Sequence, residues 1–325
     1  MKGSHHIAIE SSRLKYEFDI KRNITIIQGD SATGKTTLID LLNTYGRYGV
    51  ESGIMLNSDV PCIVFSANPI TWQDTLKTYN DSIIFFDEDY SFIFSKDFAE
   101  TIRDSSNYYV LITRQPLYNL PYSIKEIYGI RTTGKYHFPE KIYHEFYPIY
   151  TDVGIYEIKD AVVLVEDTGS GFQFYQKICG ADKCQSAGGN SKIVGKLENM
   201  PHDKHVTVIA DGAAFGAYVA SVLAISKRMS DVQLYFPESF EWIILKSGII
   251  KVDNIDNILE RPEDFIESRA FFSWERFFED ILVKATIDDP IRRYSKSKLS
   301  SFYYEGKNKD SILSIMPKGV FDKII

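Results

Sequence analysis

Residues 24–37 read ITIIQGDSATGKTT, and this stretch decides the fold of the first half of the chain. Its first four residues are apolar or β-branched, which is typical of a buried strand. The loop that follows is framed by Gly29 and Gly34, and the apolar spacing over residues 38–42 then predicts a helix. A strand, a glycine-framed loop and a helix in this order indicate an α/β domain.

The glycine-framed loop has the residue types that hold the phosphates of a nucleotide. Its two glycines let consecutive backbone N–H groups face an anion, beside the positive end of the helix dipole. We expect Lys35 to reach the β- and γ-phosphates and the Thr36 hydroxyl to bind Mg²⁺. The sequence therefore predicts a site for a nucleoside triphosphate, taken as ATP, with Mg²⁺. The predicted nucleotide-binding residues are Gly29, Asp30, Ser31, Ala32, Thr33, Gly34, Lys35, Thr36 and Thr37, with Thr113 and Arg114 from a later strand.

Two later apolar runs end in polar residues suited to the same site. Residues 82–86 lead into Asp87 and Glu88. Asp87 is predicted to hold the Mg²⁺, and Glu88 to orient or deprotonate the attacking water, which makes Glu88 and Lys35 the predicted catalytic residues. The other run, 108–112, leads into Thr113 and Arg114, which either contact the γ-phosphate or form a plain strand-end turn. Further strands are expected at 6–10, 14–18 and 61–65, the last completing a small parallel sheet.

Leading antiparallel strands, a P-loop and a strand ending in Asp87-Glu88 resemble the ATP-binding cassette class of P-loop NTPases, with its SMC and OLD relatives. The resemblance covers residues 6 to 135 and implies an ATPase. One departure is clear, because residues 37–87 contain no Leu-Ser-Gly-Gly-type segment and no long helical insertion. In that class the segment closes the site across a dimer, so its absence implies a minimal ATPase and leaves a homodimer open.

Length and composition indicate an ordinary soluble protein of two domains. The chain has 325 residues, which is enough for two hydrophobic cores, and we expect domains at 1–150 and 155–325. No apolar run is long enough to cross a bilayer, and the N-terminus has no signal-peptide pattern, so no membrane partner and a cytoplasmic location are expected. The net charge of −7 argues against binding nucleic acid through overall charge.

The second half begins a new α/β pattern. Apolar strands are expected at 161–165, 205–210 and 232–236, with helices between them. Each strand is followed closely by a carboxylate: Glu166, Asp211 and Glu238. Because the carboxyl ends of parallel strands share one edge of a sheet, these three residues are predicted to form a second metal site suited to phosphodiester chemistry.

The spacing of these acids resembles the Toprim fold of topoisomerases, primases and OLD-family nucleases, over residues 158 to 245. That resemblance implies a metal-dependent action on DNA or RNA, in a mobile-element or phage-defence setting. Where the Toprim pattern has Asp-x-Asp, this chain has Asp211-Gly212-Ala213, so one expected ligand is missing. The whole chain also resembles a protein family of Gram-positive bacteria and their mobile elements, through residues 29–37, 209–216 and 237–242.

The last 80 or so residues are predicted to be mostly helical. An aromatic stripe from Phe265 to Leu282 is interpreted as one helix docked on the second domain. Residues 292–309 interleave basic and aromatic side chains, which either form a nucleic-acid groove or are a solvated segment with some core aromatics.

Three functions remain open from the sequence. The first is an ATPase that controls a Toprim-like nuclease, and the second is a nucleotide-dependent switch whose second domain binds a partner without chemistry. The third is a small-molecule kinase, which the large second domain and the lack of an arginine-rich lid disfavour. The acidic net charge and Ala213 favour the switch.

Overall fold

The computed structural model describes residues 1–29, 33–133, 141–151, 161–201, 203–229 and 231–318. The chain folds into two compact units, one formed by Met1–Thr151 with Arg261–Phe272, the other by Asp152–Glu260 with Ser273–Ile325. Residues 261–272 thus belong with the first unit, although they come late in the sequence. Among the described residues, no helix is long and apolar enough to cross a membrane.

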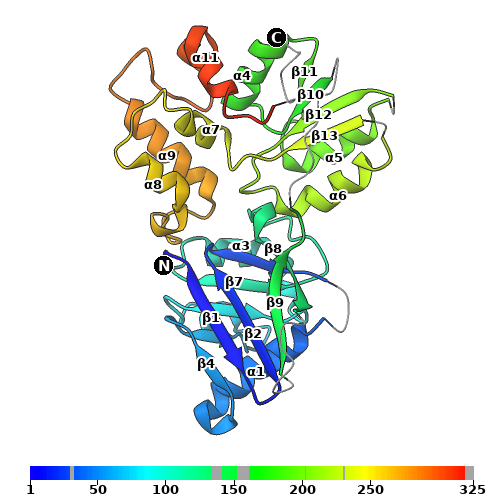
Figure 1. The fold of residues 1–325 in the computed structure, drawn as a ribbon, viewed down its shortest axis with the longest axis vertical. Helices are drawn as coiled ribbons and strands as arrows, with labels where there is room; N and C mark the ends of the chain where they lie inside the picture. Colours follow the sequence, from blue (N-terminus) through cyan, green and yellow to red (C-terminus); the bar gives the residue numbers. More distant parts are fainter. Residues whose placement is uncertain (30–32, 134–140, 152–160, 202, 230, 319–325) are drawn as a thin grey trace. The chain divides into compact units, whose positions relative to one another are not determined.

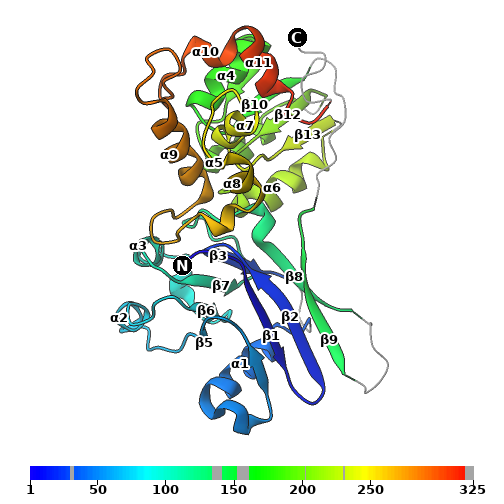
Figure 2. The same ribbon diagram turned by 60° about the vertical axis from the view of Figure 1, so that its left-hand side comes forward.

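The first unit is built on one nine-stranded mixed sheet with the order β4-β1-β2-β9-β8-β3-β7-β6-β5 (Figures 1 and 2). Strands β8, β3, β7, β6 and β5 are parallel to one another, and β1 pairs antiparallel with β2 and β4. Its strands are β1 His5–Glu10, β2 Leu14–Ile20, β3 Ile24–Ile27, β4 Met55–Asn57, β5 Cys62–Val64, β6 Ile83–Phe86, β7 Tyr108–Ile112, β8 Ile127–Thr132 and β9 Ile142–Pro148. Its helices are α1 Lys35–Tyr48, η1 Gly49–Ser52, α2 Trp72–Leu76, η2 Ser91–Phe94, α3 Lys96–Arg103, η3 Ile124–Glu126 and η4 Pro262–Asp264.

The small parallel sheet expected from the sequence is therefore part of a larger mixed sheet. β9 pairs antiparallel with β8 and parallel with β2, and so joins both groups of strands into one sheet. The core on one side includes Leu38, Ile39 and Leu42 of α1, which pack with Ile27 of β3 and Val110 of β7. This packing fixes the start of α1 beside the carboxyl ends of the parallel strands.

A buried ion pair ties the start of β3 to η3, which precedes β8. Arg22 Nε lies 3.2 Å from Glu126 Oε1, and the two side chains are only 6% and 1% exposed. The Tyr128 hydroxyl also donates to Glu126, over 3.2 Å. Since a charge left buried without its partner is costly, this pair fixes the position of β8 beside β3.

Replacing Glu126 by alanine is expected to lower the free energy of unfolding by about 3–5 kcal/mol, because Arg22 would remain buried without its partner. Chemical denaturation of the first unit measures this loss. The matched control is Glu145→Ala, which breaks the more exposed pair of Arg131 and Glu145 in the same sheet and should cost about 1 kcal/mol or less. Equal losses in the two variants would contradict the role given to the buried pair.

The second unit contains a four-stranded parallel sheet with the order β11-β10-β12-β13 (Figure 1). The strands are β10 Val162–Val165, β11 Cys184–Ser186, β12 His205–Ile209 and β13 Asp231–Tyr235. The helices are α4 Ser170–Cys179, α5 Asn190–Glu198, α6 Gly216–Ser226, α7 Phe240–Lys246, α8 Ile255–Glu260, α9 Trp274–Thr286, α10 Ser301–Tyr304 and α11 Gly306–Leu313. The α/β class predicted for this half is confirmed, and β11 is an additional strand.

The predicted single helix over the aromatic stripe is wrong. Only the part from Trp274 onward is helical, as α9, whose Phe277, Phe278 and Leu282 are buried in the second unit. Phe265 lies just after η4 in the segment that joins the first unit, where Ser268 donates its backbone N–H to Met1 O over 2.9 Å. Hydrogen bonds between residues far apart in the sequence thus override the apparent helical spacing.

Candidate functional site

Loops from three parallel strands of the first unit emerge at one edge of its sheet. Ile27 of β3 pairs with Ile112 of β7, and Leu111 of β7 pairs with Phe86 of β6. The residues that follow these strands therefore lie along the same edge: Gln28 and Gly29 after β3, Asp87 and Glu88 after β6, Thr113 and Arg114 after β7. This edge is the one at which ligands bind in open parallel sheets.

Both glycines of the loop after β3 are required by the backbone. Gly29 has φ +136° and Gly34 has φ +98°, a region that other residues rarely adopt. A Cβ on Gly34 would also lie 2.7 Å from the hydroxyl of Tyr16. The predicted ligands Asp30, Ser31 and Ala32 lie outside the described residues.

Lys35 is the first residue of α1, and its side chain is held within the loop. Its Nζ donates to Gly29 O over 2.8 Å and to Thr33 Oγ1 over 3.2 Å, and the residue is only 6% exposed. Among the described residues, no side chain caps the N-terminus of α1, and no acidic residue lies in its first turn. The ammonium and the first N–H groups of the helix thus make a positively charged end at which Thr36 is exposed and Thr37 is half-buried.

An aromatic pair that sequence reasoning missed supports this loop. The hydroxyl of Tyr16, on β2, donates to Gly34 O over 2.9 Å. The ring of Tyr16 stacks on that of His144, on β9, with centroids 4.3 Å apart. Burial raises the pKa of Tyr16 to about 12 and lowers the pKa of His144, so both rings are neutral near pH 7. The signal was hidden because β9 pairs with β2 across more than 120 positions of sequence.

The acids after β6 are held in two different ways. Asp87 Oδ1 accepts the backbone N–H of Glu88 over 2.8 Å, and the residue is half-buried. Glu88 forms an ion pair with Arg114 from the neighbouring strand end, with Nε and Oε2 3.1 Å apart. The Thr113 hydroxyl instead closes a turn with the backbone of Gln115 over 3.0 Å. Of the two predicted γ-phosphate contacts, Arg114 is thus the one that reaches the acid after β6.

In the second unit, two of the three predicted metal ligands lie together. Glu166 and Asp211 line one cavity with Asp167, beyond the carboxyl ends of β10 and β12. Its volume is about 10 Å³, close to the ~10–15 Å³ that one water molecule needs. Glu238 is buried and does not line this cavity. No group of three or more His, Cys, Asp or Glu residues suited to a metal occurs in the part of the chain that the structure describes.

Three further charged residues, which the sequence did not reveal as a group, interact electrostatically with Asp211 or with one another. Glu241 at the start of α7 is 1% exposed and accepts a short hydrogen bond from the Tyr294 hydroxyl, while its Oε2 has no hydrogen-bond partner among the described residues. Lys296 pairs with Glu275 of α9. The Gln173 side chain of α4 donates to Ser297 O and accepts the backbone N–H of Leu299, and so holds the backbone that follows Lys296.

Burial and mutual repulsion make these carboxylates hard to ionise. Burial, and then the negative charges of Asp167 and Glu275, raise the pKa of Glu166 to about 7. Burial, followed by Glu275 and Glu241, raises the pKa of Asp211 well above its usual range. For Lys296, burial opposes the charge, but Glu275 and Glu241 outweigh it and raise the pKa. With all of its carboxylates ionised, the cluster would carry more negative charge than Lys296 balances, so a bound cation would favour the ionised forms.

The run at 292–309 has core aromatics, as the second interpretation expected. Tyr294 and Tyr303 are buried, at 3% and 0% exposure. Among the basic side chains, Lys296 pairs with Glu275, and Arg292 Nε lies 3.3 Å from Asp289 Oδ2. These aromatic rings are therefore not available as a platform for stacking bases.

Comparison of the chain with protein-family models, with curated proteins and with solved structures gave no match.

Proposed function

We propose that the first unit binds ATP with Mg²⁺ at the loop after β3 and hydrolyses it. The observation that carries this proposal is the position of Lys35, whose ammonium is held by loop oxygens at the N-terminus of α1. Those oxygens are what the phosphates would replace, because a phosphate oxygen is a stronger acceptor for an ammonium than a carbonyl. In this reading the glycine-framed loop supplies backbone donors, and Lys35 supplies charge.

The residues at this edge fit a magnesium ion. Mg²⁺ takes oxygen ligands and keeps several waters, and two such donors are present here. Thr36 has an exposed hydroxyl at the start of α1, and Asp87 has one carboxylate oxygen beyond the one bonded to Glu88 N. When bound, the ion would neutralise charge on the phosphates.

Glu88 and Arg114 are proposed to act as a pair in hydrolysis. Glu88 accepts a proton from the attacking water or orients it, which requires its carboxylate to be ionised. The ion pair with Arg114 holds the carboxylate at the end of β6. Arg114, at the end of β7, would then face the γ-phosphate and stabilise the charge of the transition state.

The experiment that tests this function is release of phosphate from ATP by the purified chain, with Mg²⁺ and with excess chelator. Hydrolysis that requires Mg²⁺ and falls in Asp87→Asn supports the proposal. Absence of any turnover in the wild-type chain under both conditions, with or without DNA and RNA, would remove the ATPase proposal.

A second candidate function concerns the second unit and is favoured by its acidic cavity. Glu166 and Asp211 are proposed to hold a divalent cation that acts on the phosphodiester of DNA or RNA. The acid missing at Ala213 is offset in this proposal by Glu241, whose unpaired oxygen lies in the same charged cluster. Lys296 would supply positive charge for the phosphate. The ATP state of the first unit would then control this chemistry.

The competing proposal is a switch without nucleic-acid chemistry. The negative net charge and the buried aromatics of residues 292–309 favour it. Incubation with single- and double-stranded DNA and RNA, ATP and Mg²⁺ separates the two proposals. Cleavage that is lost in both Asp211→Asn and Lys296→Met favours the nuclease, and ATP hydrolysis without any cleavage favours the switch.

Mg²⁺ is expected to stabilise the second unit more at about pH 8 than at about pH 6. The pKa of Glu166 is raised from 4.5, its value in the unfolded chain, to about 7 in the folded unit. The metal-free unit therefore loses stability as the pH rises through this range, and a bound cation would restore the lost stability. Saturation at about 100 times Kd adds about 2.7 kcal/mol. Thermal unfolding of wild type, Asp211→Asn and the exposed-surface control Asp253→Asn measures the effect, and an equal response of all three would contradict cation binding at Asp211.

A further inference from the structure

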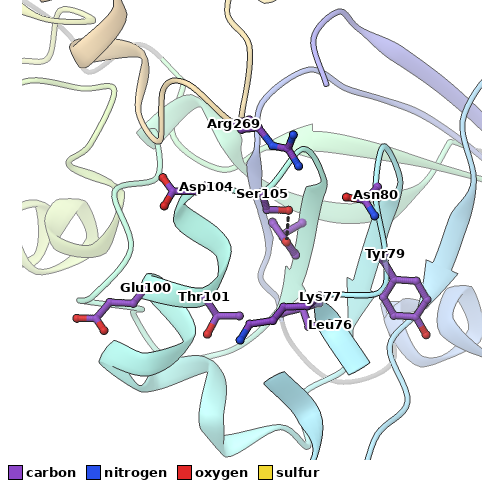
Figure 3. A pocket seen from close by; sticks show the side chains of 10 residues that line it. Leu76, Lys77, Tyr79, Asn80, Glu100, Thr101, Asp104, Ser105 and Arg269 are labelled. Carbon is purple, nitrogen blue, oxygen red and sulfur yellow. Dashed lines mark hydrogen bonds between the residues drawn. The ribbon is translucent and has the colours of Figure 1, made fainter. Parts of the chain in front are cut away.

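A second polar cavity lies in the first unit at the amino ends of β6 and β7, the opposite edge of the sheet from the loop after β3 (Figure 3). Its volume is about 180 Å³, below the ~300 Å³ at which pockets for drug-sized ligands begin. The cavity therefore suits a molecule of a few heavy atoms. Its lining residues come from α2 and the turn after it, from α3 and its end, from β7, and from the segment Arg261–Phe272.

Hydrogen bonds fix the inner wall of this cavity before any ligand binds. The Asn107 side chain donates to Tyr79 O over 2.8 Å and accepts the backbone N–H of Ser82 over 3.1 Å. The Tyr109 hydroxyl donates to Ser105 Oγ over 2.7 Å. A preformed polar wall lowers the entropy cost of binding a small polar molecule.

Arg269 is placed at the cavity by the segment Arg261–Phe272, which we call the late segment. Hydrogen bonds hold the late segment on residues of the first half of the chain. They include those from Gly3 N to Glu263 O over 2.7 Å, from Ser268 N to Met1 O over 2.9 Å, from Asn23 Nδ2 to Phe272 O over 2.7 Å, and from Ser268 Oγ to Ser105 O over 3.3 Å. The last of these joins the late segment directly to the cavity wall.

Four charged side chains line the cavity without partners. Lys77, Glu100, Asp104 and Arg269 are all exposed, and within the described residues none of these side chains makes a hydrogen bond or ion pair. Figure 3 shows Arg269 and Asp104 in the upper part of the view and Lys77 and Glu100 in the lower part. Each part thus offers one positive and one negative group, so the cavity complements a neutral molecule with separated charges better than a simple anion or cation.

We propose that this cavity binds a free polar α-amino acid. The carboxylate of the ligand pairs with Arg269 and its ammonium with Asp104, because a free amino acid carries both charges on one carbon and these two residues line the same part of the cavity. The polar side chain of the ligand then lies toward Lys77 and Glu100. A peptide has only one of the two charged groups at each end, so the cavity selects the free amino acid.

Binding has a consequence for the late segment. The ligand joins Arg269 to Asp104 at the end of α3, so it adds a contact between the late segment and the body of the first unit. The residues on both sides of the late segment, Glu260 and Ser273, belong to the second unit. The ligand therefore stabilises a segment of the first unit at whose two ends the chain continues into the second unit.

The experiment is a calorimetric titration of the full chain with each of the twenty common amino acids. We expect one or more polar members to bind, and the N-acetyl and the amide derivative of the same amino acid to bind at least about tenfold more weakly, since each lacks one charge. Binding of none of the twenty, or equal binding of both derivatives, would overturn the proposal.

Matched variants locate the site. Arg269→Gln and Asp104→Asn should each weaken binding at least about tenfold, whereas the exposed-surface controls Arg47→Gln and Asp253→Asn should leave it unchanged. The amino acid should also slow hydrogen exchange at the amide of Ser268, which bonds to Met1 O. Unchanged binding in Arg269→Gln and Asp104→Asn would place the ligand elsewhere and contradict the assignment. ATP is absent from these titrations, so their outcome does not depend on the proposed ATPase.

Discussion

Replacing Glu88 by glutamine is expected to lower the rate of ATP hydrolysis by about 10²–10⁴, the usual contribution of a positioned general base. Glutamine keeps the shape of the side chain and loses its basicity. Arg114 would lose its ion pair at the same time, although this pair is largely exposed and adds little to stability. ATP binding should remain close to that of the wild-type chain, because the phosphate contacts of the loop are untouched.

The control for Glu88→Gln is Asp89→Asn, which removes a negative charge from the next exposed position. Steady-state phosphate release and equilibrium ATP binding are measured on both variants. The combination expected for Glu88→Gln is slow turnover with retained binding. A rate equal to that of Asp89→Asn would show that Glu88 is not the base.

Replacing Lys35 by alanine is expected to lower kcat/KM for ATP by at least about 100-fold, as for the loss of one strong charged donor to the transition state. Unlike Glu88→Gln, this change also removes a contact to bound phosphates and weakens ATP binding. The matched control is Lys96→Ala, because Lys96 is also the first residue of a helix in the same unit and is exposed. Circular dichroism of both variants checks that the fold persists. Equal kinetics in the two variants would contradict the role of Lys35.

The parallel core of the first unit could be predicted because its signals are local. The loop with Gly29 and Gly34 follows an apolar run directly, and Asp87 and Thr113 each follow another. Strand β8 was missed because Gly129 interrupts it, and a glycine inside a strand resembles a break. That glycine is required by a long-range contact, since a Cβ there would lie 2.5 Å from the ring of Tyr147 on β9.

The parts that could not be predicted depend on contacts between distant residues. Tyr16 and His144 meet through the pairing of β2 with β9, and the late segment joins the first unit through hydrogen bonds to Met1 and Gly3. In the second unit, Lys296 was predicted as part of a basic run, whereas its partner Glu275 lies on α9. Periodicity and motif spacing carry no information about such pairs.

The acids of the second unit show the same limit. Glu166 and Asp211 follow neighbouring parallel strands, so the edge rule brings them together. Glu241 lies in the cluster because α7 begins just beyond β13, with Ser239 accepting the N–H of Trp242 over 3.1 Å as its cap. In the sequence, Glu238 is nearer to the end of β13 than Glu241, so the strand-end pattern favours Glu238.

The most direct test of the central proposal is the affinity of the chain for ATP, measured by calorimetry with and without Mg²⁺. We expect the wild-type chain to bind ATP and Mg²⁺ to tighten the binding. Asp87→Asn should lose most of the effect of Mg²⁺, and Lys35→Ala should lose most of the binding itself. No binding of ATP to the wild-type chain in the presence of Mg²⁺, or unchanged affinity in Lys35→Ala, would contradict it.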